Sequence, residues 1–221
     1  MSTSSVAIIP IKAISTRVPE KNFRMLGGKK LYEHIIEHTI EAECFDAIYI
    51  DTDSDEIKEY AHIRSLKVID RLPWLASDEA NGNDLLVHEK TVCPPYDLYF
   101  QLFATAPFLK SKTIAACVTA LKNSQEYDSV FTATLERGWY WMEGMPVNFR
   151  PGILPRSQDA RHPIKETTGL YGITNASLER YHCRIGRKPY AHIVEDHEAV
   201  DLDTEEDFKY AEYLLTQGII K

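Results

Sequence analysis

The sequence predicts an α/β fold, with a mostly parallel sheet and helices on both of its faces. Short apolar runs alternate along the chain with segments whose apolar residues recur at helical spacing. Such alternation builds right-handed strand–helix–strand units, which give a parallel sheet covered on both sides. At about 100–200 residues per domain, the length of 221 residues favours a single domain. The alternation is interrupted by one excursion, around residues 139–163.

Five short apolar runs have the length of strands. A strand that is buried on both faces reads as a nearly continuous apolar run, without the alternation of a half-exposed strand. The most apolar run is the fourth, which precedes a loop rich in alanine and threonine. The runs cover residues 6–10, 47–51, 67–69, 97–103 and 128–134.

Four segments have helical periodicity. In the first, Leu31 and Ile35 begin an apolar stripe with helical spacing. The second follows Asp53 or Ser54, either of which is positioned to cap a helix. The last begins after Asp203, and its first turn carries three acidic residues, which suits the positive end of the helix dipole. The segments cover residues 31–42, 57–66, 112–121 and 204–215.

Composition and charge exclude several classes of protein. The chain has 25 Lys and Arg against 33 Asp and Glu, a net charge of −8, which argues against a nucleic-acid partner because phosphate binding needs a basic surface. No apolar run approaches the about 20 residues of a membrane helix, and the N-terminus has no signal-peptide pattern, so we expect no membrane partner. The four cysteines lack metal-ligand spacing. We therefore expect a cytoplasmic protein with reduced thiols.

The loop after the first strand concentrates groups that bind anions. Lys12, Arg17 and Lys21 provide three cations, and Ser15 and Thr16 provide two hydroxyls. Cations, hydroxyls and backbone N–H groups together form a cradle for a polyphosphate. The glycines of the phosphate-binding and dinucleotide-binding fingerprints are missing. A solvated basic loop remains the alternative on charge spacing alone.

This loop resembles the N-terminal signature of the cytidylyltransferases that activate acidic sugars, the CMP-acylneuraminate and CMP-Kdo synthetases. Its continuation, residues 22–31, is similar to the family stretch from Lys-Asn to Gly-Lys-Pro-Leu. Five further segments match in the family's order, and six matches with natural spacing are specific. The five lie at residues 45–54, 70–78, 103–107, 128–130 and 200–204.

The resemblance implies a fold and a reaction. The fold is a single Rossmann-like nucleotidyltransferase domain over residues 1–221, with residues 139–163 as a lid or dimerisation element. The reaction joins CMP from CTP to an acidic sugar of the acylneuraminate type and releases pyrophosphate with the help of Mg²⁺. We expect a homodimer, because the aromatic and proline-rich excursion fits a partner surface.

The implied nucleotide site combines the basic loop with three later residues. Lys21 is expected to reach the triphosphate, and Lys12 replaces the family's arginine, so a point charge replaces a bidentate fork. Arg71 is implied to hold the nucleotide, and Asn81 and Asn83 to face the cytosine, although Asn81 is also suited to cap a helix. The full set is Lys12, Ala13, Ser15, Arg17, Lys21, Asn22, Arg71, Asn81 and Asn83.

Asp201 and Asp203 are the implied ligands of Mg²⁺. In an extended segment, residues i and i+2 point to the same side, so the two carboxylates converge on one hard cation, which prefers oxygen ligands. Together with Lys21 they form the predicted catalytic set. The alternative is that Asp203 only caps the last helix.

The expected binding site for the CMP acceptor matches the family pattern at only some positions. Phe103 replaces the family's glutamine, and Gln101 points the same way on the strand. Arg156 is expected to read the acceptor's anionic group. Glu166 stands where the sialic acid enzymes carry a basic residue, so a phosphonate acceptor stays open. The predicted acceptor contacts are Gln101, Thr105, Arg156, Gln158 and Glu166.

A second class of function also stays open at this point, namely a regulatory protein that binds a nucleotide sugar without catalysis. Retention of Lys21, Asp201 and Asp203 argues against it, because such a protein has no need of metal ligands.

Overall fold

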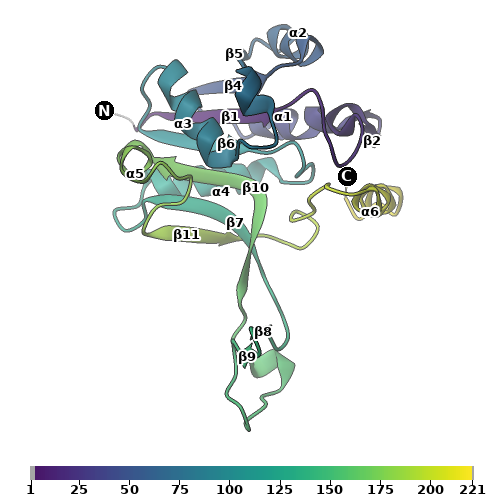
Figure 1. Cartoon of the computed structure of the whole chain (residues 1–221), viewed down its shortest axis with the longest axis vertical. Coiled ribbons are helices and arrows are strands. Elements are labelled where there is room, and N and C mark those ends of the chain that lie inside the picture. Colours follow the sequence, from purple (N-terminus) through teal and green to yellow (C-terminus); the bar gives the residue numbers. More distant parts are fainter. Residues whose placement is uncertain (1–2, 221) are drawn as a thin grey trace.

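A seven-stranded sheet in the order β11-β7-β10-β6-β1-β4-β5 forms the centre of the computed structural model, which describes residues 3–220. Six strands run parallel, and β10 runs antiparallel to both of its neighbours. The predicted α/β class with a mostly parallel sheet is therefore confirmed (Figure 1). The strands are β1 (Ser5–Ile11), β4 (Ala47–Thr52), β5 (Lys67–Asp70), β6 (Leu98–Leu102), β7 (Ser129–Leu135), β10 (Ile164–Thr174) and β11 (Pro189–Ile193).

Helices cover both faces of the sheet, as predicted. One apolar core joins α1, α2 and α4 to one face, and a second core joins α3 and α5 to the other. All seven residues of β1 are buried, because its side chains alternate between these two cores: Ile9 faces the first and Ile8 the second. The helices are α1 (Leu31–Glu41), α2 (Asp55–Ile63), α3 (Gly82–Val92), α4 (Ser111–Lys122), α5 (Asn175–Tyr181) and α6 (Glu205–Thr216).

The last helix, α6, packs against the segment that follows β1. Phe208 and Leu214 of α6 share an apolar cluster with Val18, Leu26 and Leu31. This segment contains a 3-10 turn (Lys21–Phe23) and a small hairpin, β2 (Met25–Leu26) with β3 (Lys29–Lys30). Figure 1 shows α6 beside β2, so the last helix lies next to the segment that follows β1.

The sequence pattern predicts neither β10 nor β11, and the reason is visible at Gly172. A Cβ atom at this position would lie 2.3 Å from the Phe100 ring and 2.8 Å from Val130. Glycine is therefore required where β10 passes between β6 and β7, and it breaks the apolar run that would reveal a strand. Prediction from local pattern fails here because the constraint comes from neighbouring strands.

Residues 136–163 leave the sheet between β7 and β10 and form an arm that projects from the rest of the protein (Figure 1). The predicted excursion over 139–163 corresponds to this arm. It contains a hairpin, β8 (Trp141–Met142) with β9 (Met145–Pro146), and a 3-10 turn (Ser157–Asp159). Asn148 ties it together by donating to the carbonyl oxygens of Gly138 and Arg161.

Among residues 3–220, none of the helices combines the length and the apolar character that crossing a bilayer requires.

Candidate active site

A pocket of about 230 Å³ lies at the carboxyl ends of β1 and β6. Its wall on one side is the loop after β1, and on the other side the segment after β6. Ligands of open α/β sheets bind beyond the carboxyl ends of the strands, which is the position of this pocket. The lining residues are Pro10, Lys12, Ser15, Thr16, Arg17, Lys21, Asn22, Asp78, Phe103, Ala104 and Thr105.

The carboxylate of Asp203 bridges two cations of this loop. Lys21 Nζ lies 2.8 Å from Asp203 Oδ1, and Arg17 Nη1 lies 2.6 Å from Asp203 Oδ2. Burial favours a higher pKa for Asp203, but the hydrogen bond and charge of Lys21, helped by Arg17, outweigh it and hold this pKa below its usual range. Asp203 is therefore ionised at neutral pH.

Asp203 does not cap α6, so that alternative is wrong. Thr204 is the cap: its hydroxyl accepts from Asp207 N, while the Asp207 side chain accepts from Thr204 N. Leu202 is fully buried, and its N–H donates to the carbonyl oxygen of Thr105 at 2.8 Å. This bond holds the segment that carries Asp203 against the pocket wall.

Asp201 has an unsatisfied oxygen. Its Oδ1 atom is buried, and no donor among residues 3–220 reaches it. A buried carboxylate oxygen without a partner is costly, and a hard cation is the kind of partner it lacks. Asp201 therefore offers an unpartnered oxygen to Mg²⁺, whereas Asp203 would have to release Lys21 or Arg17 to join the ion.

Two hydrogen bonds set the shape of the loop itself. Ala13 N donates to Asp53 Oδ1 at 2.7 Å, and Asn22 Nδ2 donates to the Lys12 carbonyl oxygen at 2.9 Å. Lys12 Nζ in turn pairs with Asp78 at 2.9 Å. Ala13 and Asn22 thus fix the loop, and Lys12 reaches across the pocket.

Arg71 lies outside the pocket, contrary to expectation. Its guanidinium is buried and pairs with Asp51, with Nε 3.0 Å from Oδ1 and Nη2 2.9 Å from the Asp51 carbonyl oxygen. It is held there because Asp51, at the end of β4, is completely buried and needs a counter-charge.

Asn81 and Asn83 organise the start of α3 and do not line the pocket. Asn81 caps the helix in a capping box with Asp84, so the capping alternative holds for this residue. Asn83 Oδ1 accepts from Arg184 N at 3.0 Å. Both amides are thus used for holding backbone in place.

The predicted acceptor residues fall into two groups. Thr105 lines the pocket, and Glu166 lies on β10, where its carboxylate accepts from the Tyr171 hydroxyl. Arg156 and Gln158 lie on the arm, away from the pocket of their own chain, and Arg156 pairs with Asp159 instead. The cause is the pairing of β7 with the start of β10, which carries the intervening residues away from the sheet.

Gln101 is fully buried and belongs to a polar cluster that the sequence does not predict. Its Nε2 donates to Gly82 O and to Glu89 Oε2. Burial, followed by the negative charge of Asp51, raises the pKa of Glu89 well above its usual range. Asp51 Oδ2 and Glu89 Oε1 have no N–H or hydroxyl donor among the described residues. A proton on Glu89 supplies the missing donor, since its carboxyl is hydrogen-bonded to that of Asp51.

Tyr171 and Arg184 also lie near the pocket and were missed. The Tyr171 ring packs edge-on against Phe103 with centroids 6.1 Å apart, and the Arg184 guanidinium stacks over Tyr171. Arg184 follows α5 without any recognisable motif, and β10 was not predicted, so no local signal identifies either residue.

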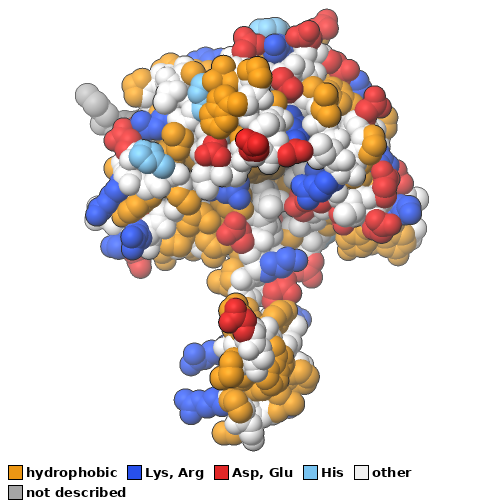
Figure 2. Space-filling model, in the orientation of Figure 1, with side chains coloured by type: hydrophobic (Ala, Val, Ile, Leu, Met, Phe, Trp, Pro, Cys, Tyr) orange, Lys and Arg blue, Asp and Glu red, His pale blue; other side chains and the backbone are white. Residues whose placement is uncertain are grey.

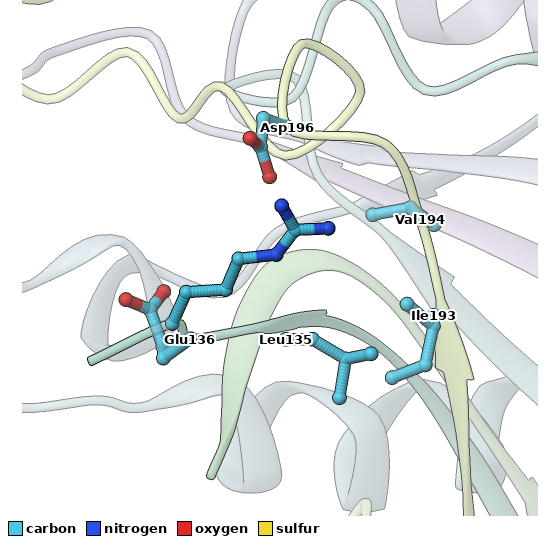
Figure 3. Close-up of a pocket in the computed structure, with 6 residues that line it drawn as sticks. Leu135, Glu136, Ile193, Val194 and Asp196 are labelled. Carbon is cyan, nitrogen blue, oxygen red and sulfur yellow. The ribbon is translucent and has the colours of Figure 1, made fainter. Parts of the chain in front are cut away.

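A second cavity, of about 470 Å³, lies where the arm joins the sheet. In Figure 3 Leu135 and Ile193 border this space on one side, and Asp196 points toward it from the other. None of the predicted catalytic residues lines it.

A cluster of possible metal ligands also lies away from the pocket: Glu195, His197 and Glu198. The Lys110 ammonium already occupies its centre, 2.8 to 3.1 Å from an atom of each.

Comparison with known proteins identifies the family. A family model described as cytidylyltransferase matches residues 6–214. The chain belongs to this family. N-acylneuraminate cytidylyltransferase A of Danio rerio is 27% identical over 214 residues, which cover 93% of this chain and 49% of the relative. CMP-N,N'-diacetyllegionaminic acid synthase of Legionella pneumophila is 31% identical over 144 residues, covering 61% of this chain and 60% of the relative.

The chain spans about half the length of the N-acylneuraminate cytidylyltransferases that it matches. Among solved structures, a CMP:2-keto-3-deoxy-manno-octonic acid synthetase in complex with CTP is similar at a TM-score of 0.71 and 17% identity, covering 98% of this chain and 100% of that one. At this identity the likeness shows a shared fold.

The proton on Glu89 gives a testable dependence of stability on pH. Because burial raises the pKa of folded Glu89 above its ordinary value of 4.5, the unfolded chain releases this proton at lower pH than the folded chain. The contribution of Glu89 to the free energy of unfolding is therefore complete below pH 4.5 and falls as pH rises toward the folded pKa. Glu89→Gln keeps the shape and the donor but does not titrate.

We expect the variant to gain stability relative to the natural protein between about pH 5 and 8, with a gain of about 1.4 kcal/mol for each pH unit over which only the folded state holds the proton. Urea unfolding across this range measures it, with the exposed Glu59→Gln as control. A difference that stays constant with pH would show that Glu89 is ionised in the fold.

Proposed function

We propose that this protein is a CTP-dependent cytidylyltransferase that joins CMP to an acidic sugar and releases pyrophosphate. The observation that carries the proposal is the bridge from Asp203 to Lys21 and Arg17, located at the carboxyl end of β1 in a chain of the cytidylyltransferase family. It places a buried ammonium and an exposed guanidinium on the lining of one pocket and ties both to one carboxylate. Relatives named for acylneuraminate and diacetyllegionaminic acid support an acidic sugar as the acceptor.

The loop cations suit a triphosphate. Lys21 is buried, whereas the Arg17 side chain is 66% exposed, and both are held by Asp203. Lys12 lines the same pocket. Charges fixed around a leaving pyrophosphate stabilise it without reorganisation, which is the largest contribution in many phosphoryl and nucleotidyl transfers.

Mg²⁺ is part of the proposal, held by Asp201 and Asp203. The unsatisfied Oδ1 of Asp201 supports this assignment, and the ionised state of Asp203 fits it. When bound, the ion would polarise the α-phosphate and lower the pKa of an acceptor hydroxyl. The protein's own contribution is to place the carboxylates, with Leu202 anchored to Thr105, and to hold the two cations beside them.

The unpaired thiols of the four cysteines fit a reducing cytoplasm.

Pyrophosphate release tests this function. The protein is incubated with CTP, Mg²⁺ and, one at a time, N-acetylneuraminic acid, N,N'-diacetyllegionaminic acid, Kdo and an aminoalkyl phosphonate. We expect turnover with an acidic sugar, and a preference for CTP over ATP and GTP, because the chain belongs to the cytidylyltransferase family. Equal turnover with a purine triphosphate, or turnover with the phosphonate alone, would contradict the proposal.

We also propose a homodimer formed through the arm, residues 136–163. Several large apolar side chains of the arm are exposed together, including Trp141 at 61% and Ile153 at 67%. Contiguous apolar patches of this kind mark interaction surfaces, whereas scattered single residues do not. Figure 2 shows apolar side chains covering much of the arm. Exposed Leu135 and Ile193 continue this surface into the cavity at the arm's base. A second copy of the chain would bury both surfaces at once and bring the partner's arm toward the sheet.

The triple variant Trp141→Ser, Ile153→Ser, Leu154→Ser is expected to be monomeric at micromolar concentration by sedimentation equilibrium, whereas the natural protein is dimeric. Replacing three large apolar contacts removes several kcal/mol of association free energy, at about 1.5–3 kcal/mol each. Trp74→Ser, at an exposed tryptophan away from the arm, is the control and should remain dimeric. A natural protein that is monomeric and fully active would refute the dimer.

A further inference from the structure

We propose that Arg184 binds the carboxylate of the CMP acceptor and so selects acidic acceptors. This inference rests on the proposed function and deepens it, because it assigns the acceptor's anionic group to a residue outside the motifs that identify the family. Arg156, the residue expected in this role, lies on the arm and pairs with Asp159.

Arg184 is fixed beside the pocket by its backbone and by two aromatic rings. Its N–H donates to Asn83 at the start of α3. Its guanidinium carbon lies 3.7 Å from the centroid of the Tyr171 ring and 5.5 Å from that of Phe103, which lines the pocket. Stacking occupies the flat face of a guanidinium and leaves its N–H edge available for a ligand.

The absence of a side chain at Gly82 makes this placement possible. A Cβ atom there would lie 2.4 Å from Arg184 Nη1. The glycine at the first position of α3 thus provides the space that Arg184 Nη1 occupies.

The Arg184 guanidinium has no acidic counter-ion among the described residues. Within residues 3–220, no carboxylate lies within 4.0 Å of its guanidinium, and no side-chain hydrogen bond satisfies it. The other cations around the pocket differ in this respect, since Lys12 pairs with Asp78, and Lys21 and Arg17 pair with Asp203. A half-buried cation without a counter-ion is a site prepared for an anion.

The groups around Arg184 describe the rest of the ligand. Gln101 is completely buried, yet its Oε1 has no donor, and it lies 3.4 Å from the same Cβ position at Gly82. The Tyr171 hydroxyl donates to Glu166. The oxygens of Gln101 and Glu166 can accept hydrogen bonds from hydroxyl or amide N–H groups of a ligand. The site therefore fits a molecule that carries a carboxylate together with several hydroxyls.

The charges of Arg184 and of Asp201, one of the proposed metal ligands, both act on the Tyr171 hydroxyl. Burial, the bond to Glu166 and the negative charge of Asp201 raise the pKa of the Tyr171 hydroxyl, while the positive charge of Arg184 opposes the rise. Asp201 and Arg184 therefore each lie within electrostatic reach of Tyr171.

The experiment compares Arg184→Gln and Arg184→Lys with the natural protein, using the acidic sugar that the pyrophosphate assay identifies and the methyl ester of its carboxylate. Loss of a charge-assisted pair costs roughly 10- to 100-fold, so Arg184→Gln should lower kcat/KM for the acid by that factor. The KM for CTP and the melting temperature should stay unchanged. The lysine variant should keep part of the activity, because it retains the charge but lacks the fork.

The ester separates recognition from structure. The natural protein should have a higher kcat/KM for the acid than for its ester, and Arg184→Gln should lose this preference. If Arg184 had only a structural role, the substitution would lower kcat/KM for both substrates equally. Arg187→Gln, at an exposed arginine of the same loop that stacks on Tyr181, is the matched control. An undiminished preference for the acid in Arg184→Gln would overturn the assignment.

Binding of the acid without turnover distinguishes this inference from the proposed function. If no acid of the panel is turned over, calorimetry with N-acetylneuraminic acid in the presence of CTP decides. Binding to the natural protein that Arg184→Gln abolishes supports the anion site while rejecting the reaction. Equal binding to both proteins, or binding to neither, overturns the site.

Discussion

The carboxylate of Asp203 is the group on which the arrangement of the pocket depends. It accepts from Lys21 and Arg17, which lie 182 and 186 residues earlier in the chain. Lys21 is buried, and a buried ammonium without a counter-charge is strongly destabilising. The protein therefore has to bring its last segment to the loop after β1, and the pocket forms where these two parts meet. A ligand that takes over the two cations acts on the interaction that closes this contact.

The packing around this ion cluster explains why it forms at this edge of the sheet. The apolar face of α6 covers Val18 and Leu26, next to the loop, and Thr204 caps the helix without help from Asp203. The cap leaves Asp203 available to the cations, and the bond from Leu202 to Thr105 sets its distance from β6. Apolar contacts thus provide the stability, and the charges provide the chemistry.

The parts of the fold that follow from local pattern could be predicted from the sequence. Continuous apolar runs identify β1, β4 and β6, because these strands are buried on both faces, and the cap at Ser54 identifies α2. The loop cations and Asp203 could be predicted because each of the two motifs that carry them is a short continuous segment, although the motifs lie at opposite ends of the chain. Arg71 could not be placed correctly, since its partner Asp51 is buried by distant elements. The same reason explains why β10, Tyr171 and Arg184 were missed: their positions depend on Gly172 and Gly82, where the absence of a side chain matters only after neighbouring elements have packed.

The measurement that tests this account most directly is calorimetric binding of CTP with and without Mg²⁺, to the natural protein and to Asp203→Asn. Thr204 caps α6, so the helix should remain, whereas loss of the counter-charge of Lys21 should lower the melting temperature. An unchanged circular dichroism spectrum at the temperature of the experiment checks that the variant is folded. The account predicts that Mg²⁺ strengthens binding to the natural protein, by about tenfold or more for a well-placed charge. In the variant this gain should disappear, while metal-free CTP binds at least as tightly because no carboxylate competes for Lys21 and Arg17. An equal gain from Mg²⁺ in both proteins would contradict the central role of Asp203.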